Sequence, residues 1–234
     1  FSSRMVIKLL KKKKNEEYKN LPQTLADIDM LGYKHVSVVS INIFPTDEHE
    51  VLKKIVDGFK HFSLANISCT NALLTKTKET TAFLKDLNEQ ISKDDTANLY
   101  VIHGTPRLDT VGIDSISYSA SFLELISENN FTCSLEGAFP YFEINDVIKS
   151  RIEKLGLKKV QVVPLLLVSG NHYIEDMFEI KDDLSDKFES FIVPSLTKSE
   201  KFNLIELPMI QNIIEKNIQN TFKMMGISHK EITY

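Results

Sequence analysis

Two histidines and one glutamate follow apolar runs in the second half of this sequence of 234 residues. His103 follows "LYVI", Glu136 follows "TCSL", and His172 comes shortly after the apolar run 160–168. Each separation is roughly 35 positions, the length of one strand-helix-strand unit. Parallel strands end at the same edge of a sheet, where open α/β sheets bind ligands. Two imidazoles and one carboxylate there would suit Co²⁺, Fe²⁺, Ni²⁺ or Zn²⁺, without choosing among them.

Each of these residues also has a purely structural interpretation. A single histidine at a strand end is more often a hydrogen-bonded loop residue than a ligand. Glu136, beside Gly137, could instead be the carboxylate that begins a helix. Their joint placement at three successive strand ends favours an open site with three ligands, which can release its ion. Cys69 and Cys133 lie in strand-like runs, and we expect buried free thiols in a reducing compartment.

Alternating strands and helices are the main organisation of the chain, and this order predicts α/β architecture with parallel sheets. Pro22, Gly32 and Pro45 mark the ends of predicted elements. The predicted strands are 35–44, 65–74, 98–103, 131–135, 159–168 and 190–193. The predicted helices begin near the amino terminus and then span 22–30, 46–59, 77–91, 118–127, 145–155, 174–188 and 208–225.

The polar stretch 93–96 is the predicted boundary between two similar lobes with a cleft between them. We expect an α/β lobe over 1–95, a second lobe carrying the metal site over 96–205, and a last helix over 206–234 that packs back toward the first lobe. The first lobe offers only two strands. It is therefore expected to be incomplete at its amino terminus, and about 35–45 preceding residues would supply two strands and a helix.

Composition is that of a globular protein, with 42% hydrophobic residues, 26% charged residues and a net charge of −4. No basic tract points to nucleic acid, and no apolar run reaches the ~20 residues that span a bilayer. The eight glycines form neither a dinucleotide fingerprint nor a phosphate-binding loop, so no organic cofactor is expected. The expected location is the cytoplasm, although the start at Phe1 leaves an export signal open, and a homo-oligomer is also left open.

Three ordered segments resemble the anaerobic cobalt chelatases, the sirohydrochlorin cobaltochelatase family. "PLLLVSGNHYIEDM" contains His172, "VIHGTP" contains His103, and "LEGAFP" contains Glu136. The opening "FSSRMVIKLL" and the segment "LADIDMLGYKHVSVVSINIFPTDEHE" are also similar to the amino-terminal half of the family. The resemblance therefore covers most of the chain and implies a chelatase-like fold of two lobes.

The activity that this resemblance implies is insertion of Co²⁺ into sirohydrochlorin during anaerobic cobalamin synthesis, with Fe²⁺ or Ni²⁺ as further candidate metals. His103 and His172 would bind the metal and accept the pyrrole protons, and Glu136 would be the third ligand. Weaker candidates for binding the acidic tetrapyrrole are Arg4, His49 and Tyr118.

Some positions depart from the family pattern. The segment "RLDTVGIDSISY" stands where the family carries another histidine and an asparagine, "EGAFP" is one residue longer, and "SLTKSEKFN" replaces a glycine-rich segment. Two further hypotheses therefore stand beside the enzyme. One is a protein that binds a tetrapyrrole or metal without catalysis, and the other is a structural or regulatory domain without a ligand.

Overall fold

A computed structural model describes residues 4–168, 170 and 175–227. The chain divides into two compact units, Phe1–Ala72 with Ile214–Tyr234, and Leu73–Ile213. The predicted boundary at residue 95 lies later in the chain than this division. The division comes earlier because helix α4 (Thr77–Ile91) packs against helix α5 (Ile113–Ile126) of the second unit.

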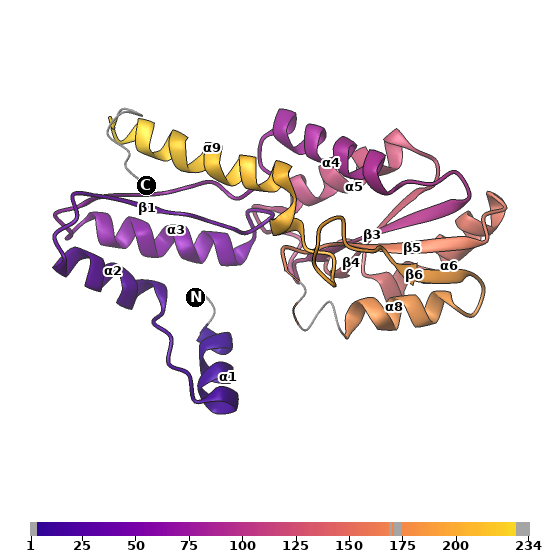
Figure 1. Ribbon diagram of the computed structural model, residues 1–234, viewed down its shortest axis with the longest axis horizontal. Coiled ribbons are helices and arrows are strands. Elements are labelled where there is room, and N and C mark those ends of the chain that lie inside the picture. Colours follow the sequence, from indigo (N-terminus) through magenta and orange to yellow (C-terminus); the bar gives the residue numbers. More distant parts are fainter. Residues whose placement is uncertain (1–3, 169, 171–174, 228–234) are drawn as a thin grey trace. The chain divides into compact units, whose positions relative to one another are not determined.

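The first unit begins with α1 (Arg4–Lys14), followed by α2 (Leu21–Met30), β1 (His35–Val38), α3 (Asp47–Lys60) and β2 (Asn66–Cys69). Strands β1 and β2 pair in parallel. Buried side chains of α2, α3 and both strands form one apolar core. The carboxyl-terminal part of α9 (Pro208–Met224) also belongs to this unit, and it lies on the side of the strands away from α3 (Figure 1).

Both strands of this unit are shorter than predicted. The backbone N–H of Ser40 donates to the side-chain oxygen of Thr70 at 2.8 Å, where a continuing ladder would use a backbone carbonyl. The following apolar residues are nevertheless buried, including Phe44, Leu73 and Leu74. Their apolar character therefore reflects burial of irregular backbone and not longer strands.

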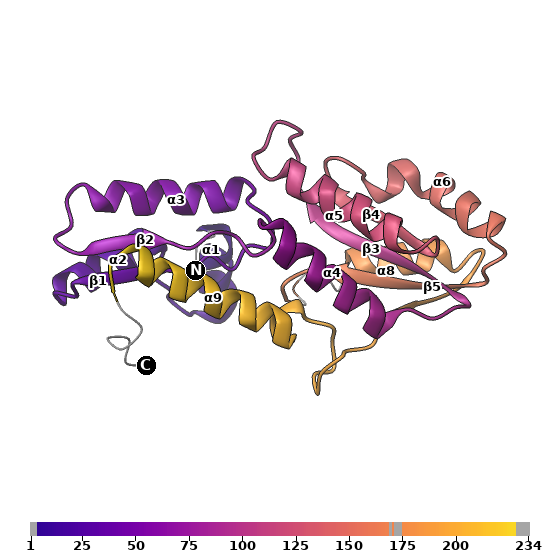
Figure 2. The same ribbon diagram turned by 90° about the horizontal axis from the view of Figure 1, so that it is seen from above.

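The second unit contains one parallel sheet in the order β4-β3-β5-β6. Its strands are β3 (Thr96–Gly104), β4 (Asn130–Glu136), β5 (Lys159–Leu165) and β6 (Glu189–Ile192). Helices α4 and α5 cover one face, whereas α6 (Tyr141–Lys154) and α8 (Asp176–Leu184) cover the other (Figures 1 and 2). A short 3-10 helix, η1 (Leu204–Glu206), precedes α9. The predicted parallel sheets flanked by helices are thus confirmed.

A row of buried amides crosses this sheet and fixes its register. Asn98 lies opposite both Asn130 and Gln161, on β4 and β5 respectively. Its amide donates to the Asn130 side chain at 2.7 Å and accepts from Gln161. Any slip of one strand would leave these buried amides unpaired, at a cost of ~1–3 kcal/mol for each group. The row therefore holds the carboxyl ends of β3 and β4 level with each other.

Among the described residues, no helix has the length and apolar character that crossing a bilayer requires.

Candidate metal centre

His103 and Glu136 lie at the ends of adjacent parallel strands. β3 is an inner strand of its sheet, with β4 on one side and β5 on the other. Gly104, the residue after His103, is the register partner of Glu136. Both side chains are exposed. The structure therefore brings two of the three predicted ligands to the same edge of the sheet.

At these strand ends, Gly104 and Gly137 let the two backbones approach each other closely. A Cβ atom on Gly104 would lie 1.9 Å from the Glu136 carbonyl oxygen, and one on Gly137 would lie 1.9 Å from the Thr105 carbonyl oxygen. Both glycines also have φ above +80°, a region that other L-residues rarely adopt. Each candidate ligand is thus followed by a glycine whose missing side chain lets the two backbones meet. The sequence showed these glycines but not that each lies against the backbone of the other strand end.

Ser134 fixes the loop that carries Glu136. Its backbone N–H donates to the Phe139 carbonyl at 2.7 Å, and its hydroxyl accepts from the Phe139 N–H at 3.2 Å. The loop after His103 is held in a similar way, because the Thr110 hydroxyl donates to the Arg107 carbonyl at 2.6 Å and lies 3.1 Å from the Thr105 hydroxyl. The two loops therefore position the candidate ligands from rigid strand ends.

Nδ1 of His103 lies 3.4 Å from the carbonyl oxygen of Gly104. A histidine that binds a metal through one nitrogen commonly donates a hydrogen bond from the other to a carbonyl or carboxylate. This contact is long for a hydrogen bond. In this conformation Nδ1 faces the backbone carbonyl, and Nε2 is the nitrogen directed away from it.

The third predicted ligand, His172, lies outside the described residues. The strand that leads to it, β5, pairs with β3, with Leu165 opposite Ile102. Across the described parts of the chain, no three His, Cys, Asp or Glu side chains are grouped closely enough to hold a metal ion. The described portion of the site therefore consists of His103 and Glu136.

The turn η1 supports the chain where it leaves β5. Backbone N–H groups of Leu204 and Ile205 donate to the carbonyls of Leu166 and Leu167 at 3.3 and 3.1 Å. Next to these residues, Glu206 accepts hydrogen bonds from three side chains, those of Ser199, Thr197 and Asn203. These bonds lower the pKa of Glu206 and tie the segment 197–203 to η1.

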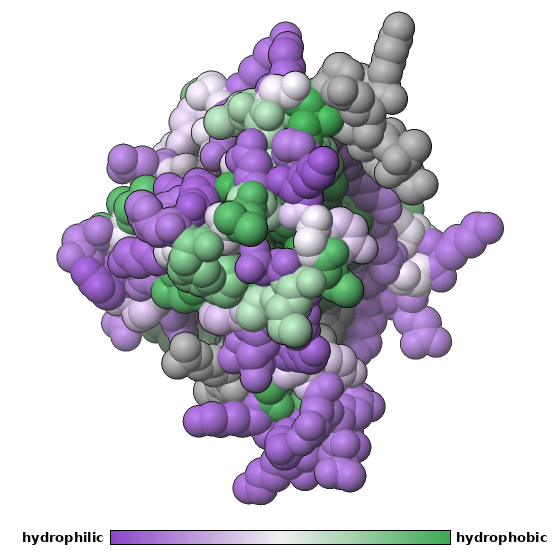
Figure 3. Space-filling model, turned by 90° about the vertical axis from the view of Figure 1, so that its left-hand side faces the viewer, coloured by the Kyte–Doolittle hydropathy of each residue, from purple (hydrophilic) through white to green (hydrophobic). Residues whose placement is uncertain are grey.

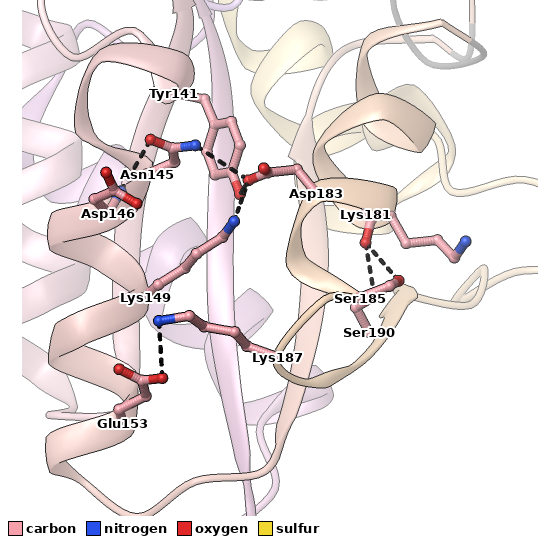
Figure 4. Close-up of polar contacts among 10 residues, drawn as sticks. All are labelled: Tyr141, Asn145, Asp146, Lys149, Glu153, Lys181, Asp183, Ser185, Lys187 and Ser190. Atoms are coloured by element: carbon pink, nitrogen blue, oxygen red, sulfur yellow. Dashed lines mark hydrogen bonds and ion pairs between the residues drawn. The ribbon is translucent and has the colours of Figure 1, made fainter.

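A polar network joins α6, which follows Glu136, to α8, which follows the segment containing His172 (Figure 4). The carboxylate of Asp183 accepts from the Tyr141 hydroxyl at 2.6 Å and from Asn145 at 3.3 Å. Its ion pair with Lys149 is 2.8 Å long, and the Lys149 side chain is only 8% exposed. Burial raises the pKa of Asp183, but the hydrogen bonds from Lys149, Tyr141 and Asn145 outweigh it, and the net pKa is lowered.

We expect Asp183→Asn to lower the free energy of unfolding by about 2–3 kcal/mol at neutral pH, because the change leaves the buried Lys149 ammonium without its counter-ion. A lowered folded pKa stabilises the protein above the unfolded pKa of about 3.9, and this stabilisation disappears as the pH falls through the folded value. The difference between wild type and variant should therefore shrink below about pH 4. Urea unfolding of both proteins at pH 7 and pH 3 measures this difference in unfolding free energy.

Glu153→Gln provides a matched control for this prediction. Glu153 of α6 pairs with Lys187 at 3.0 Å, but both side chains are about half exposed. Loss of such a pair costs less than ~1 kcal/mol. Equal losses for Asp183→Asn and Glu153→Gln would show that the buried network adds nothing beyond a surface ion pair.

The three weaker candidates for substrate binding have different surroundings. His49 is buried, and its Nδ1 lies 2.8 Å from the Ser40 hydroxyl. Burial lowers its pKa, so the imidazole is held neutral. Tyr118 on α5 is 38% exposed, and its ring stacks on Phe122 at 6.1 Å between centroids. Arg4 is the first residue of α1. Whether these residues bind substrate stays a prediction.

Both cysteines are free thiols as predicted, but only Cys133 is buried, whereas Cys69 is partly exposed. Burial raises the pKa of both thiols. The pKa of the partly buried Cys69 rises to about 11, and that of the fully buried Cys133 is raised further. Metal ions bind the thiolate form. Both thiols are therefore protonated at neutral pH in the absence of a metal ion.

The family model described as cobalt chelatase (CbiK) matches residues 1–223. The chain belongs to the cobalt chelatase family. This membership confirms the resemblance that the segments around His103, Glu136 and His172 indicated.

One curated relative in this family is the sirohydrochlorin cobaltochelatase of Salmonella typhimurium, which is 21% identical over 179 residues. The match covers 76% of this chain and 65% of the relative, so the chain spans slightly less than two thirds of that protein.

Solved chelatase structures share the fold. SirB from Bacillus subtilis with Fe³⁺ matches with a TM-score of 0.63 at 15% identity, over 90% of this chain and 81% of SirB. The sirohydrochlorin chelatase SirB in complex with cobalt gives 0.58 at 13% identity, over 89% and 78%. A multi-domain protein of Deinococcus radiodurans with structural similarity to chelatases gives 0.55 at 13% identity, over 91% and 49%. The predicted chelatase-like fold is thereby confirmed.

Proposed function

We propose that this protein inserts a divalent metal ion into sirohydrochlorin, with Co²⁺ as the first candidate and Fe²⁺ or Ni²⁺ as alternatives. The observation that carries the proposal is the position of His103 and Glu136 at the carboxyl ends of adjacent parallel strands, where Gly104 and Gly137 let the two backbones approach closely. Family membership supports the reaction class, and the names of the relatives support sirohydrochlorin as the substrate.

The metal ion is a substrate that the protein must hold and then release. An imidazole nitrogen, a carboxylate and a second imidazole make a site of intermediate softness that suits Co²⁺, Fe²⁺ and Ni²⁺. Three protein ligands leave open positions through which the macrocycle nitrogens could displace them. We assign Nε2 of His103, the Glu136 carboxylate and His172 to this set, with His172 assigned from the sequence segment alone.

Two pyrrole protons must leave the macrocycle as the metal enters. A neutral histidine at the metal-bearing edge can accept a proton once its nitrogen is released from the ion. His103 and His172 are therefore assigned both roles, while the Glu136 carboxylate is assigned to balance the positive charge of the metal. The exposure of His103 and Glu136 gives both side chains access to a ligand from solution.

A spectroscopic metallation assay tests the proposal. The chain is mixed with sirohydrochlorin and, in separate reactions, Co²⁺, Fe²⁺ or Ni²⁺, and the absorption of the macrocycle is followed without oxygen. Repeated turnover well above the spontaneous rate is the expected result. A spectral shift that stops at one macrocycle per chain would instead identify a binding protein, and no change with any metal would contradict both interpretations.

A further inference from the structure

Three buried polar side chains join α3 to the carboxyl ends of β1 and β2. His49, Ser40 and Thr70 are each at most 4% exposed. Nδ1 of His49, in the first turn of α3, lies 2.8 Å from the Ser40 hydroxyl oxygen. The Ser40 backbone N–H donates to the Thr70 hydroxyl oxygen at 2.8 Å, and the Thr70 N–H donates to the Val38 carbonyl at 2.9 Å. A chain of hydrogen bonds therefore runs from the helix through the end of one strand to the end of the other.

These residues lie at the edge of the first unit where its connecting segments begin. Ser40 follows closely after β1, and Thr70 comes directly after β2. The carboxyl ends of parallel strands form the edge at which open α/β sheets bind ligands. Phe44, in the segment between β1 and α3, is buried as well. The three side chains therefore fix the shape of that edge, and separating them would release the segment 39–46.

A neutral imidazole suits this place, whereas a charged one does not. A neutral histidine has one donor and one acceptor nitrogen, so Nδ1 can pair with a hydroxyl in either direction. That hydroxyl supplies no negative charge to balance an imidazolium. Leu52 and Val56, which follow His49 at helical spacing, are buried in the apolar core. Cys69 packs on the same core and is neutral, because burial raises the pKa of its thiol to about 11. A charge on His49 would therefore lose hydration without a compensating partner.

The charged groups around His49 do not reverse this preference. Burial has the largest effect and lowers the pKa of His49, while Glu50 raises this pKa and Lys53 lowers it. Asp47 and Glu48 of the same turn are exposed, where water and salt screen their charge. In the part of the chain that the structure describes, no charged group of β1 or β2 shifts this pKa. The positive end of the α3 dipole also disfavours a cation in the first turn.

We propose that His49, Ser40 and Thr70 form an acid-sensitive latch, which ties the carboxyl ends of β1 and β2 to α3 at neutral pH and releases them in mild acid. The latch does not depend on the proposed metal insertion.

The direction of the effect follows from proton binding. In the opened or unfolded chain, His49 binds a proton below about pH 6.5, whereas in the latched state it resists protonation. The latch therefore has its full strength above about pH 6.5. It weakens by up to about tenfold for each pH unit below that value, until the pH reaches the lowered pKa of the folded state.

Hydrogen exchange of the whole chain, followed by mass spectrometry, tests the latch at about pH 7.5 and pH 5.5. After correction for the chemical exchange rate at each pH, peptides covering 36–56 should lose up to about tenfold of their protection at the lower pH. Peptides from β3 in the second unit serve as an internal reference and should keep theirs. Equal protection of 36–56 at both pH values, or an equal loss in β3, would overturn the proposal.

His49→Gln should remove the pH dependence, because an amide stays neutral over this range and can still pair with the Ser40 hydroxyl. Protection of 36–56 should then be the same at both pH values, even if it is lower than in the wild type. A variant that loses as much protection in acid as the wild type would contradict the role of His49. Ser40→Ala provides a second variant, since it removes the hydroxyl that meets Nδ1. It should lower the protection of 36–56 at about pH 7.5, and wild-type protection would count against the latch.

His35→Gln is the matched control. The amino-terminal ends of β1 and β2 face the viewer in Figure 3, where hydrophilic side chains surround the hydrophobic ones. His35, the first residue of β1, is exposed. Its imidazole can bind a proton in contact with water, so this variant should keep the acid sensitivity of the wild type. Loss of that sensitivity in His35→Gln would show that His49 is not the group that responds to pH.

Discussion

Replacement of His103 by alanine is expected to lower kcat/KM for metal insertion by at least about 100-fold, the lower end of what a positioned proton acceptor contributes. The melting temperature should change by less than about 2 °C, because His103 is exposed at the end of β3 and fills no part of the core. Activity comes from absorption changes of sirohydrochlorin, and stability comes from circular dichroism.

His35→Ala is the matched control for this prediction. His35 is also an exposed histidine on a strand, but it stands at the start of β1. Its replacement should leave both activity and stability near wild-type values. An active His103→Ala variant, within about threefold of the wild type, would remove His103 from the proposed metal site.

Gly104→Ala is expected to destabilise the second unit by about 3–5 kcal/mol, through overpacking and backbone strain together, and to abolish metal insertion. The added Cβ would lie 1.9 Å from the Glu136 carbonyl oxygen, which is backbone in a paired strand and cannot move aside without breaking the sheet. The positive φ of Gly104 adds about 1–2 kcal/mol for an L-residue. Denaturant unfolding followed by circular dichroism measures the loss.

Gly156→Ala separates these two causes. Gly156 has a similar φ of +72°, but nothing lies within 4 Å of the position that its Cβ would occupy. This variant should therefore lose only the conformational cost of about 1–2 kcal/mol and should keep its activity. Equal losses of unfolding free energy in the two variants would show that the close approach of the Gly104 and Glu136 backbones contributes nothing to the cost.

The alternation of apolar runs predicted the fold well, because burial on both faces leaves a clear pattern in parallel strands. The predicted helix 77–91 agrees with α4. In the first unit, however, apolar residues beyond β1 and β2 are buried without strand pairing. There, the Ser40 backbone N–H donates to the Thr70 side-chain oxygen, and this hydrogen bond takes the place of the ladder. Apolar composition predicts burial, but it does not predict which group accepts the hydrogen bond of each backbone N–H.

For the site, the sequence predicted which strand ends carry His103 and Glu136, but not the order of the strands. Strand order is a property of the tertiary fold, so the inner position of β3 appears only in the structure. The burial of His49 could also have been predicted from the sequence, although His49 is one of the candidates for substrate binding. Leu52 and Val56 follow it at helical spacing, and all three face the core.

The central claim is that one metal ion binds His103 and Glu136 together, with His172 as the third ligand. Anomalous diffraction at the cobalt edge, from crystals of the chain grown with Co²⁺, tests it directly. We predict one strong peak about 2.0–2.2 Å from both Nε2 of His103 and a carboxylate oxygen of Glu136, with His172 completing the set. Cobalt bound only elsewhere, with no peak between His103 and Glu136, would contradict the claim.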